Sequence, residues 1–157
     1  MTYYGESTTS LDDKGRITVP VHLRTIMDKE DHWTWWVTRG FDNCLFMFPK
    51  ALWDKILQQT THGNPLDPAM LDFRRLLIGS VAPVKRDNQG RMVIPAPLRE
   101  FAQIKGEGVL LGVADHLELW GTETWQGFQQ RQAEQYKRMA SELFGRLTAQ
   151  PAPTQEG

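Results

Sequence analysis

Two arginines occupy matching places in this sequence, each directly after a glycine and four residues after an aspartate. The first set is Asp12, Gly15 and Arg16, and the second is Asp87, Gly90 and Arg91. A guanidinium is a permanent cation with a planar fork of N–H donors, so it can bind a phosphate or bridge the O6 and N7 atoms of guanine. The chemistry that these residues could supply is recognition of an anion or of a base edge.

The neighbours of each arginine predict a tight turn at the tip of a β-hairpin. The aspartate can accept hydrogen bonds from amides two residues on, and the glycine can adopt the positive φ that a short loop requires. After each glycine, two sets of residues alternate along the chain. Arg16 and Thr18 alternate with Ile17 and Val19, and Arg91 and Val93 alternate with Met92 and Ile94. This period of two predicts that the arginines are exposed and that Ile17 and Met92 are buried.

The two motifs belong to a longer duplication. Residues 12–24 and 87–99 align at a separation of 75 positions with six identities, in the pattern Asp-x-x-Gly-Arg-x-x-Val/Ile-Pro-x-x-Leu-Arg. One such motif is most simply a turn whose arginine is solvated or paired with the aspartate. Two copies favour a DNA-binding surface instead, because β-ribbons fit the major groove.

Each copy is predicted to form a strand, a tight turn, a strand, a short helix and a second pair of strands. Pro20 and Pro95 end a strand and suit the first turn of a helix. The apolar positions of these helices are Leu23, Ile26 and Met27 in the first copy and Leu98, Phe101 and Ala102 in the second. The resulting class is mainly β with helices, an α+β fold.

Helices are also predicted outside the repeated motifs. Residues 49–60 present Trp53, Ile56 and Leu57 on one face, and residues 65–80 present Met70, Phe73, Leu76 and Leu77. Thr122 is the expected N-cap of a long helix with apolar side chains at Trp125, Phe128, Tyr136, Met139, Leu143, Phe144 and Leu147. We therefore predict a first repeat at 5–60, a helical connection at 61–80, a second repeat at 81–124, a C-terminal helix at 125–147 and a disordered tail at 148–157.

Composition bounds the class of protein. The chain has 157 residues, 40% of them hydrophobic, and a single cysteine, Cys44, so a disulfide framework and a Cys-x-x-Cys zinc pair are excluded. The start of the chain resembles no signal peptide and no apolar run is long enough for a bilayer, so we expect a cytoplasmic, nucleoid-associated protein that contacts no membrane. The net charge is -1, but residues 71–105 hold seven basic and three acidic residues. A local basic surface is therefore compatible with the overall charge, although binding DNA well would need several copies in an oligomer.

Motifs of catalysis and metal binding are not found. The four histidines, His22, His32, His62 and His116, lack a metal-ligand spacing, and the sequence contains no Gly-x-Ser-x-Gly, His-Glu-x-x-His or P-loop pattern. We expect no catalytic residue, no metal, no cofactor and no small-molecule substrate, and hence no enzyme. Trp33, Trp35 and Trp36 lie in an apolar strand and are expected to pack in the core or against another subunit.

The duplicated Asp-x-x-x-Arg turn resembles the MraZ family of bacterial transcriptional regulators, which are encoded at the head of the division and cell-wall gene cluster. The resemblance covers roughly residues 1–147. It implies an AbrB-like swapped-hairpin, double-split β-barrel with pseudo-twofold symmetry, in which the two repeats of one chain replace two subunits of the single-repeat relatives. It also implies a ring-shaped homo-oligomer that binds short G-rich direct repeats of double-stranded DNA in the promoter of its own cluster.

The resemblance also implies roles for individual residues. The DNA-binding set would be Lys14, Arg16, Arg86 and Arg91, and the loops would be shaped by Asp12, Gly15, Asp87 and Gly90. Gln89 replaces the basic loop residue in the second copy, and Lys85 and Arg86 are expected to compensate for it. Arg24 and Arg99 follow on the short helices, and we expect them to form structural ion pairs.

Two other classes of protein remain open at this point. A hydrolase on a β-barrel would need a converging set of acid, base or nucleophile, whereas the repeated residues are arginines and turn formers. An oligomeric scaffold or antitoxin-like module would use its aromatic surface or its long C-terminal helix to capture a protein partner.

Overall fold

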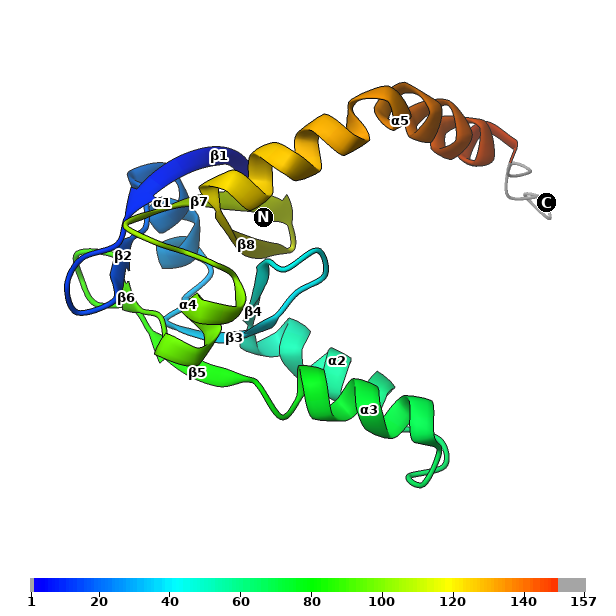
Figure 1. The fold of residues 1–157 in the computed structure, drawn as a ribbon, viewed down its shortest axis with the longest axis horizontal. Helices are drawn as coiled ribbons and strands as arrows, with labels where there is room; N and C mark the ends of the chain where they lie inside the picture. Colours follow the sequence, from blue (N-terminus) through cyan, green and yellow to red (C-terminus); the bar gives the residue numbers. More distant parts are fainter. Residues whose placement is uncertain (1, 150–157) are drawn as a thin grey trace, which may run out of the picture. The chain divides into compact units, whose positions relative to one another are not determined.

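The computed structural model describes residues 2–149, and its elements follow the order of the two repeats (Figure 1). The first half contains β1 (Tyr3–Ser10), β2 (Arg16–Thr18), α1 (Val21–Lys29), β3 (Thr34–Arg39), β4 (Leu45–Pro49) and α2 (Lys50–Thr60). After α3 (Pro68–Leu77) come β5 (Ala82–Lys85), β6 (Arg91–Val93), α4 (Ala96–Phe101), β7 (Glu107–Ala114), β8 (His116–Gly121) and α5 (Thr122–Ala149). The predicted mixture of strands and helices with a long C-terminal helix is confirmed. The predicted tail lies, from residue 150 on, outside the described residues.

The strands form a six-stranded antiparallel sheet in the order β1-β7-β8-β4-β3-β5 and a two-stranded sheet of β2 and β6. Strands from the two repeats are interleaved. β1 pairs along its whole length with β7, from Tyr3 opposite Ala114 to Ser10 opposite Glu107. β5 of the second repeat pairs with β3 of the first. Exchanging each strand for its equivalent in the other repeat reproduces the same order in reverse, so the sheet has pseudo-twofold symmetry.

One core serves both repeats. Fully buried side chains from β2, α1, β3, β4, β6, β7 and β8 form a single cluster, which includes Ile17, Met27, Trp35, Met92 and Leu117. Ile17 and Met92 are completely buried, as the alternation of residue types predicted. Because each repeat supplies part of this cluster, neither could bury its apolar strand faces alone.

The short helices begin where the prolines predicted. Pro20 precedes α1 and Pro95 precedes α4, each in an extended conformation before the first helical turn. The long helix begins differently from our expectation, because α5 includes Thr122 as its first residue. The Thr122 hydroxyl is buried and makes no hydrogen bond within the described residues, so it does not cap the helix.

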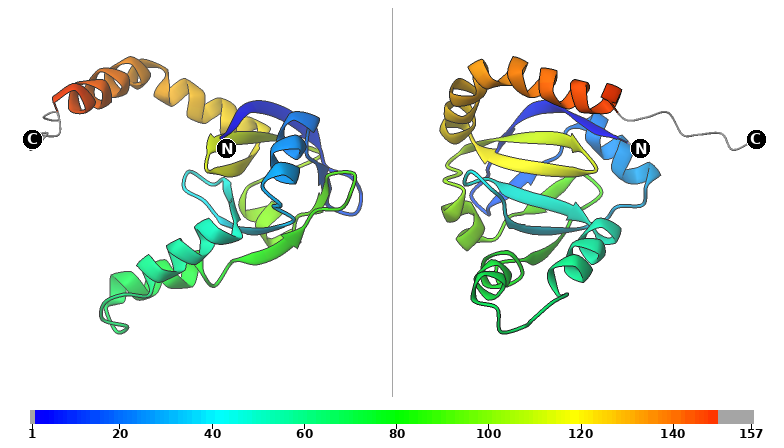
Figure 2. Two further views of the ribbon diagram at one scale, coloured as in Figure 1. Left: turned by 180° about the vertical axis from the view of Figure 1, so that it is seen from behind. Right: turned by 90° about the vertical axis from the view of Figure 1, so that its right-hand side faces the viewer.

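α2 and α3 run side by side (Figure 2) and share a second apolar cluster with β4. Phe48, Trp53 and Leu77 form its buried part. The predicted apolar face of α3 is only partly correct, because Phe73 is 37% exposed and Leu76 is 54% exposed. α3 therefore presents apolar side chains to its surroundings as well as to the core.

The chain divides into two compact units, one up to Trp125 and one from Gln126 on. Both repeats belong to the first unit, and most of α5 belongs to the second. No helix within residues 2–149 is long and apolar enough to cross a membrane.

Candidate nucleic-acid interface

The loop between β1 and β2 is closed by the carboxylate of Asp12. Its Oδ1 accepts hydrogen bonds from the backbone amides of Lys14 and Arg16, both at 2.9 Å. Its Oδ2 accepts from Nε of Arg16 at 2.7 Å. These bonds, that of the Arg16 amide first, favour the charged carboxylate and hold the pKa of Asp12 below its usual range.

The loop between β5 and β6 repeats this geometry. Oδ1 of Asp87 accepts from the amides of Gln89 and Arg91 at 2.9 Å, and Oδ2 accepts from Nε of Arg91 at 2.7 Å. The pKa of Asp87 is lowered for the same reason, first by the Arg91 amide. Each aspartate therefore fixes the conformation of its loop and binds the Nε atom of its arginine. Among the described residues, the terminal Nη atoms of both guanidinium groups have no protein partner, so they can donate to an external acceptor.

The two loops end in one ribbon rather than in two separate hairpins. β2 pairs with β6 of the other repeat, with Ile17 opposite Met92. The ribbon extends beyond these strands because Val19 donates to the Gly90 carbonyl at 2.8 Å and Ile94 donates to the Gly15 carbonyl at 2.9 Å. The pairing within one repeat that we expected is replaced on the β1 side by Thr9, whose hydroxyl oxygen bonds to both the amide and the carbonyl of Thr18. The predicted tight turn is present, because the amide of Asp12 donates to the Arg16 carbonyl at 3.0 Å and the amide of Asp87 donates to the Arg91 carbonyl at 3.0 Å. The strands that flank each turn, however, belong to different sheets, so the strand pair forms across the repeats.

The outer face of this ribbon presents the two arginines at diagonal positions. Arg16 lies opposite Val93, and Arg91 lies opposite Thr18. Ile17 and Met92, which point the other way, are buried. The side chains of Arg16 and Arg91 are 28% and 37% exposed, although each is bonded to an aspartate. The pairing thus brings both predicted motif arginines to one surface.

Arg24 and Arg99 support the loops from the short helices, each beneath the loop of the other repeat. Nη1 of Arg24 donates to the Gln89 carbonyl in the loop of the second repeat at 3.0 Å. Nε of Arg99 donates to the Ile94 carbonyl of its own repeat at 2.9 Å, and a methyl group on Gly15 in the first loop would lie 2.8 Å from Cζ of Arg99. A methyl group on Gly90 would lie 2.1 Å from Cδ of Arg24. These arginines are structural, as expected, but their contacts are hydrogen bonds to carbonyl oxygens rather than ion pairs.

Arg86 differs from our expectation. Its side chain is 2% exposed and its Nη2 atom is bonded to Asp28. Nε donates to the His32 carbonyl at 3.1 Å, and the guanidinium stacks 3.8 Å from the centre of the Trp33 ring. A guanidinium held in this way is not available to a phosphate. The expected DNA contact at Arg86 is therefore wrong, and the residue instead joins the second repeat to the α1–β3 connection of the first.

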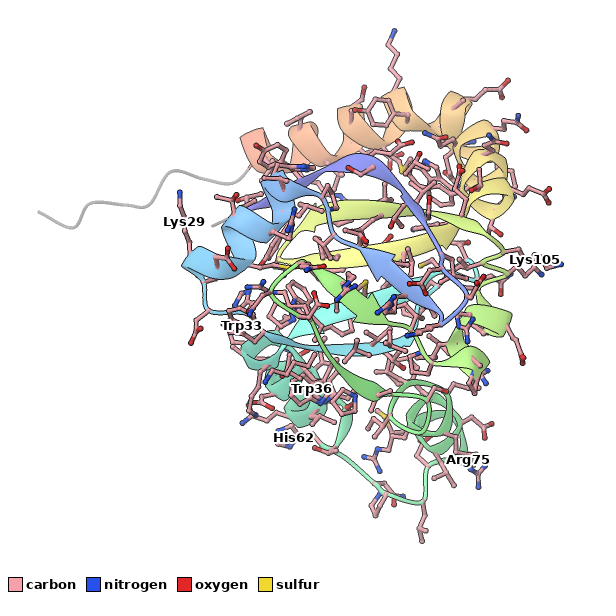
Figure 3. The ribbon with its side chains drawn as sticks, turned by 90° about the vertical axis from the view of Figure 1, so that its left-hand side faces the viewer. Lys29, Trp33, Trp36, His62, Arg75 and Lys105 are labelled. Atoms are coloured by element: carbon pink, nitrogen blue, oxygen red, sulfur yellow. The ribbon has the colours of Figure 1, made fainter. Side chains whose placement is uncertain are left out.

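The loop tips are exposed and differ in charge. Lys14 lies at the tip of the first loop and Gln89 at the equivalent place in the second, and both are exposed. Figure 3 views the molecule from the side on which β2 and β6 lie, with Lys29 and Lys105 at opposite margins of that side. Cations therefore stand at the loop tip and at the margins of this side as well as on the ribbon.

The alternation of residue types puts Thr18 and Val93 on the same side as the arginines, but the predicted DNA-binding set contains neither residue. Both are exposed, Val93 by 52%. The sequence contains the signal for this placement. Thr18 lies two positions after Arg16 and Val93 two positions after Arg91, and residues two apart share a face of a strand. Within residues 2–149, no group of three or more His, Cys, Asp or Glu side chains could hold a metal ion.

The family model and the relatives that match this chain all point to one protein family. The family model described as "MraZ protein, putative antitoxin-like" matches residues 2–71 and again residues 78–147. A protein named transcriptional regulator MraZ from Syntrophomonas wolfei is 33% identical over 142 residues, which is 90% of this chain and 96% of that protein. Proteins of the same name from Lactiplantibacillus plantarum and Frankia alni are 32% and 31% identical over 90% of this chain, and over 98% and 96% of their own lengths. With the family model matching once on each repeat and these relatives covered almost completely, the chain belongs to the MraZ family.

Proposed function

We propose that the chain is a sequence-specific, DNA-binding transcriptional regulator that reads double-stranded DNA through the β2–β6 ribbon. The observation that carries this proposal is the pairing of β2 with β6, which puts Arg16 and Arg91 on one exposed face. A two-stranded ribbon fits the major groove, and an arginine with its Nη atoms available can bridge O6 and N7 of guanine. The names of the relatives support the same function.

Lys14 completes the proposed contact set as a phosphate contact at the first loop. The motif aspartates act indirectly, because they aim the guanidinium groups and remain bonded to Nε. The nearby carboxylates of Asp12, Asp13 and Asp87 offset part of the positive charge, so one ribbon alone would bind weakly. We propose that several copies in a ring-shaped homo-oligomer bind direct repeats in the promoter of the chain's own division and cell-wall gene cluster.

Apolar side chains outside the core support self-association. Phe73 and Leu76 are exposed on α3, and Tyr136, Leu143 and Leu147 are exposed on α5. Exposed apolar residues in such groups are typical of subunit contacts. The interleaved strand order supports a further proposal, that the first unit is a swapped-hairpin, double-split barrel in which the two repeats replace two subunits.

The test is DNA binding by the full-length chain with Arg16 and Arg91 both changed to Ala. The probe is a duplex from the region upstream of the chain's own gene, and affinity is measured by fluorescence anisotropy. Loss of one guanine contact costs about 1 to 3 kcal/mol, so we expect at least a tenfold loss, multiplied where several copies bind together. Arg75→Ala is the matched control, because Arg75 is an exposed arginine on α3 (Figure 3). Wild-type affinity in a folded Arg16→Ala, Arg91→Ala variant would refute the proposal.

Lys14→Ala separates phosphate contacts from base contacts. We expect binding to weaken for all duplexes alike and the dependence of log K on log salt to fall by about one unit per lost contact. Arg16→Ala should instead reduce the difference in binding affinity between the promoter duplex and an unrelated duplex of equal length. If both variants changed the two duplexes equally, the ribbon would contact phosphates only.

An oligomeric scaffold is the second candidate function, and the apolar side chains of α5 favour it. Co-purification distinguishes the two candidates. A foreign protein at a fixed stoichiometry with the purified chain supports the scaffold, whereas a self-oligomer that retains nucleic acid supports the regulator.

A further inference from the structure

The two ends of the ribbon's outer face are related by the pseudo-twofold symmetry but are not chemically equivalent. Arg16 has Val93 directly across from it, whereas Arg91 has Thr18. Both cross-strand neighbours are exposed, with Val93 at 52%. The arginines and their aspartates are held in the same geometry, so these neighbours are the main chemical difference on the strands themselves.

An exposed valine has no hydrogen-bonding atom in its side chain, so it can recognise a base only through an apolar group. In the major groove that group is the C5-methyl of thymine. Side chains directly opposite in a strand pair lie about 5 Å apart at Cβ, and stacked base pairs are 3.4 Å apart along the helix axis. Val93 would therefore reach the base pair that Arg16 contacts or one of its immediate neighbours.

We propose that Val93 is a specificity-determining residue that contacts a thymine methyl beside the base pair read by Arg16. This inference rests on the proposed function. Thr18 holds the corresponding place beside Arg91, where its hydroxyl can donate to or accept from several base edges and its one methyl group can also touch thymine. The Val93 end of the ribbon therefore selects thymine, whereas the Thr18 end accepts several bases.

The loops strengthen this polarity. Lys14 belongs to the loop that carries Arg16, and its counterpart near Arg91 is the neutral Gln89. The end of the ribbon with Arg16 therefore combines the apolar contact with the additional cation. A protomer built in this way binds a short site in one orientation, so the site is non-palindromic. Repeated sites in one direction fit an array of such protomers better than inverted sites do.

The experiment is selection of bound duplexes from a random 20-base-pair library by the full-length wild-type chain, Val93→Ser, Val93→Ile and Thr18→Val. We expect the wild-type consensus to contain thymine beside a guanine contact on one side only. Val93→Ser, which removes both γ-methyl groups, should lose the thymine and keep the guanines, and Val93→Ile should keep both because it retains an apolar side chain. Thr18→Val should strengthen the preference for thymine on the opposite side.

Replacing that thymine by uracil in the selected duplex removes only the methyl group. Burial of one methyl-sized group corresponds to about a fourfold change in affinity for each protomer. We expect the affinity of wild type and of Val93→Ile to fall by about this much and that of Val93→Ser to stay unchanged.

The outcomes separate the two proposals. If no duplex is enriched by the wild-type chain, the DNA-binding function itself fails, and this inference with it. If duplexes with guanines are enriched but the consensus is unchanged in Val93→Ser, the function stands and the role of Val93 is refuted. An equal loss of affinity on uracil replacement in wild type and Val93→Ser would refute it as well.

Discussion

The two loop glycines provide a sharp test of how the repeats support each other. Gly15 and Gly90 have nearly the same backbone conformation, with φ of +77° and +76°. An alanine in this left-handed region costs about 1 to 2 kcal/mol. If only conformation mattered, Gly15→Ala and Gly90→Ala would destabilise the protein equally.

The surroundings make the two substitutions unequal. A methyl group on Gly15 would lie 2.8 Å from Cζ of Arg99, so this side chain needs only a small shift and can keep its hydrogen bond from Nε to the Ile94 carbonyl. A methyl group on Gly90 would lie 2.1 Å from Cδ of Arg24, in the middle of the side chain. Arg24 must then move its guanidinium from the Gln89 carbonyl, and loss of that hydrogen bond costs about 1 kcal/mol more. We expect about 1 to 2 kcal/mol for Gly15→Ala and about 2 to 3 kcal/mol for Gly90→Ala.

The assay is urea unfolding followed by tryptophan fluorescence at one fixed protein concentration, because self-association would add to the apparent stability. The same two substitutions are then made in an Arg24→Ala background. Removal of the Arg24 side chain eliminates its clash, so Gly90→Ala should fall to the cost of Gly15→Ala, a coupling of about 1 kcal/mol. Equal costs for the two glycines in the wild-type background, with no coupling to Arg24, would refute the reasoning.

Four further predictions concern other parts of the molecule. Arg86→Ala should destabilise the fold by about 2 to 4 kcal/mol in urea unfolding, because it removes a cation stacked on Trp33 and bonded to Asp28, yet the folded variant should bind DNA within about threefold of wild type. Burial opposes protonation of His116, but its bonds to Glu118 and Asp115 outweigh burial and raise the pKa of the imidazole. A raised pKa stabilises the fold below about pH 6.5 and this contribution disappears as pH rises through the folded-state pKa, so the Tm difference between wild type and His116→Gln should be larger at pH 6 than at pH 8.5, and a constant difference would contradict this assignment. Light scattering should give a closed multimer at micromolar concentration, and a stable monomer that binds DNA tightly would contradict the ring. The purified chain should not turn over ester, phosphate or nucleotide substrates, and a turnover abolished by one side-chain change would show that it is an enzyme.

Local features of the fold could be predicted from the sequence because they depend on short-range rules. The alternation after Gly15 and Gly90 correctly placed Ile17 and Met92 in the core. The prolines at 20 and 95 correctly marked the start of the short helices. The partners of the strands could not be predicted in this way, because β1 and β7 pair across about a hundred residues of sequence and nothing in either segment specifies the other.

The error at Arg86 has a similar physical origin. Counting charges along the sequence treats every cation as exposed. The groups that bury this guanidinium, Asp28 and the His32 carbonyl, are 58 and 54 residues away in the sequence. By contrast, the positions of Arg16 and Arg91 depend on a turn and on a period of two, both of which are local. Local rules therefore suffice to place each motif arginine on an outer face. That both arginines lie on the same face depends on the pairing of β2 with β6, which only the structure reveals.

The interleaved sheet also determines when the chain can fold during synthesis. β1 leaves the ribosome about a hundred residues before its partner β7. At about 5 to 20 residues per second, β1 waits for roughly 5 to 20 s with its backbone edge unpaired. Its exposed edge could pair with another nascent chain in that interval. The continuous run of glycine, glutamate and hydroxyl residues from Gly5 to Ser10 keeps most of β1 polar and reduces this hazard until the second repeat has been synthesised.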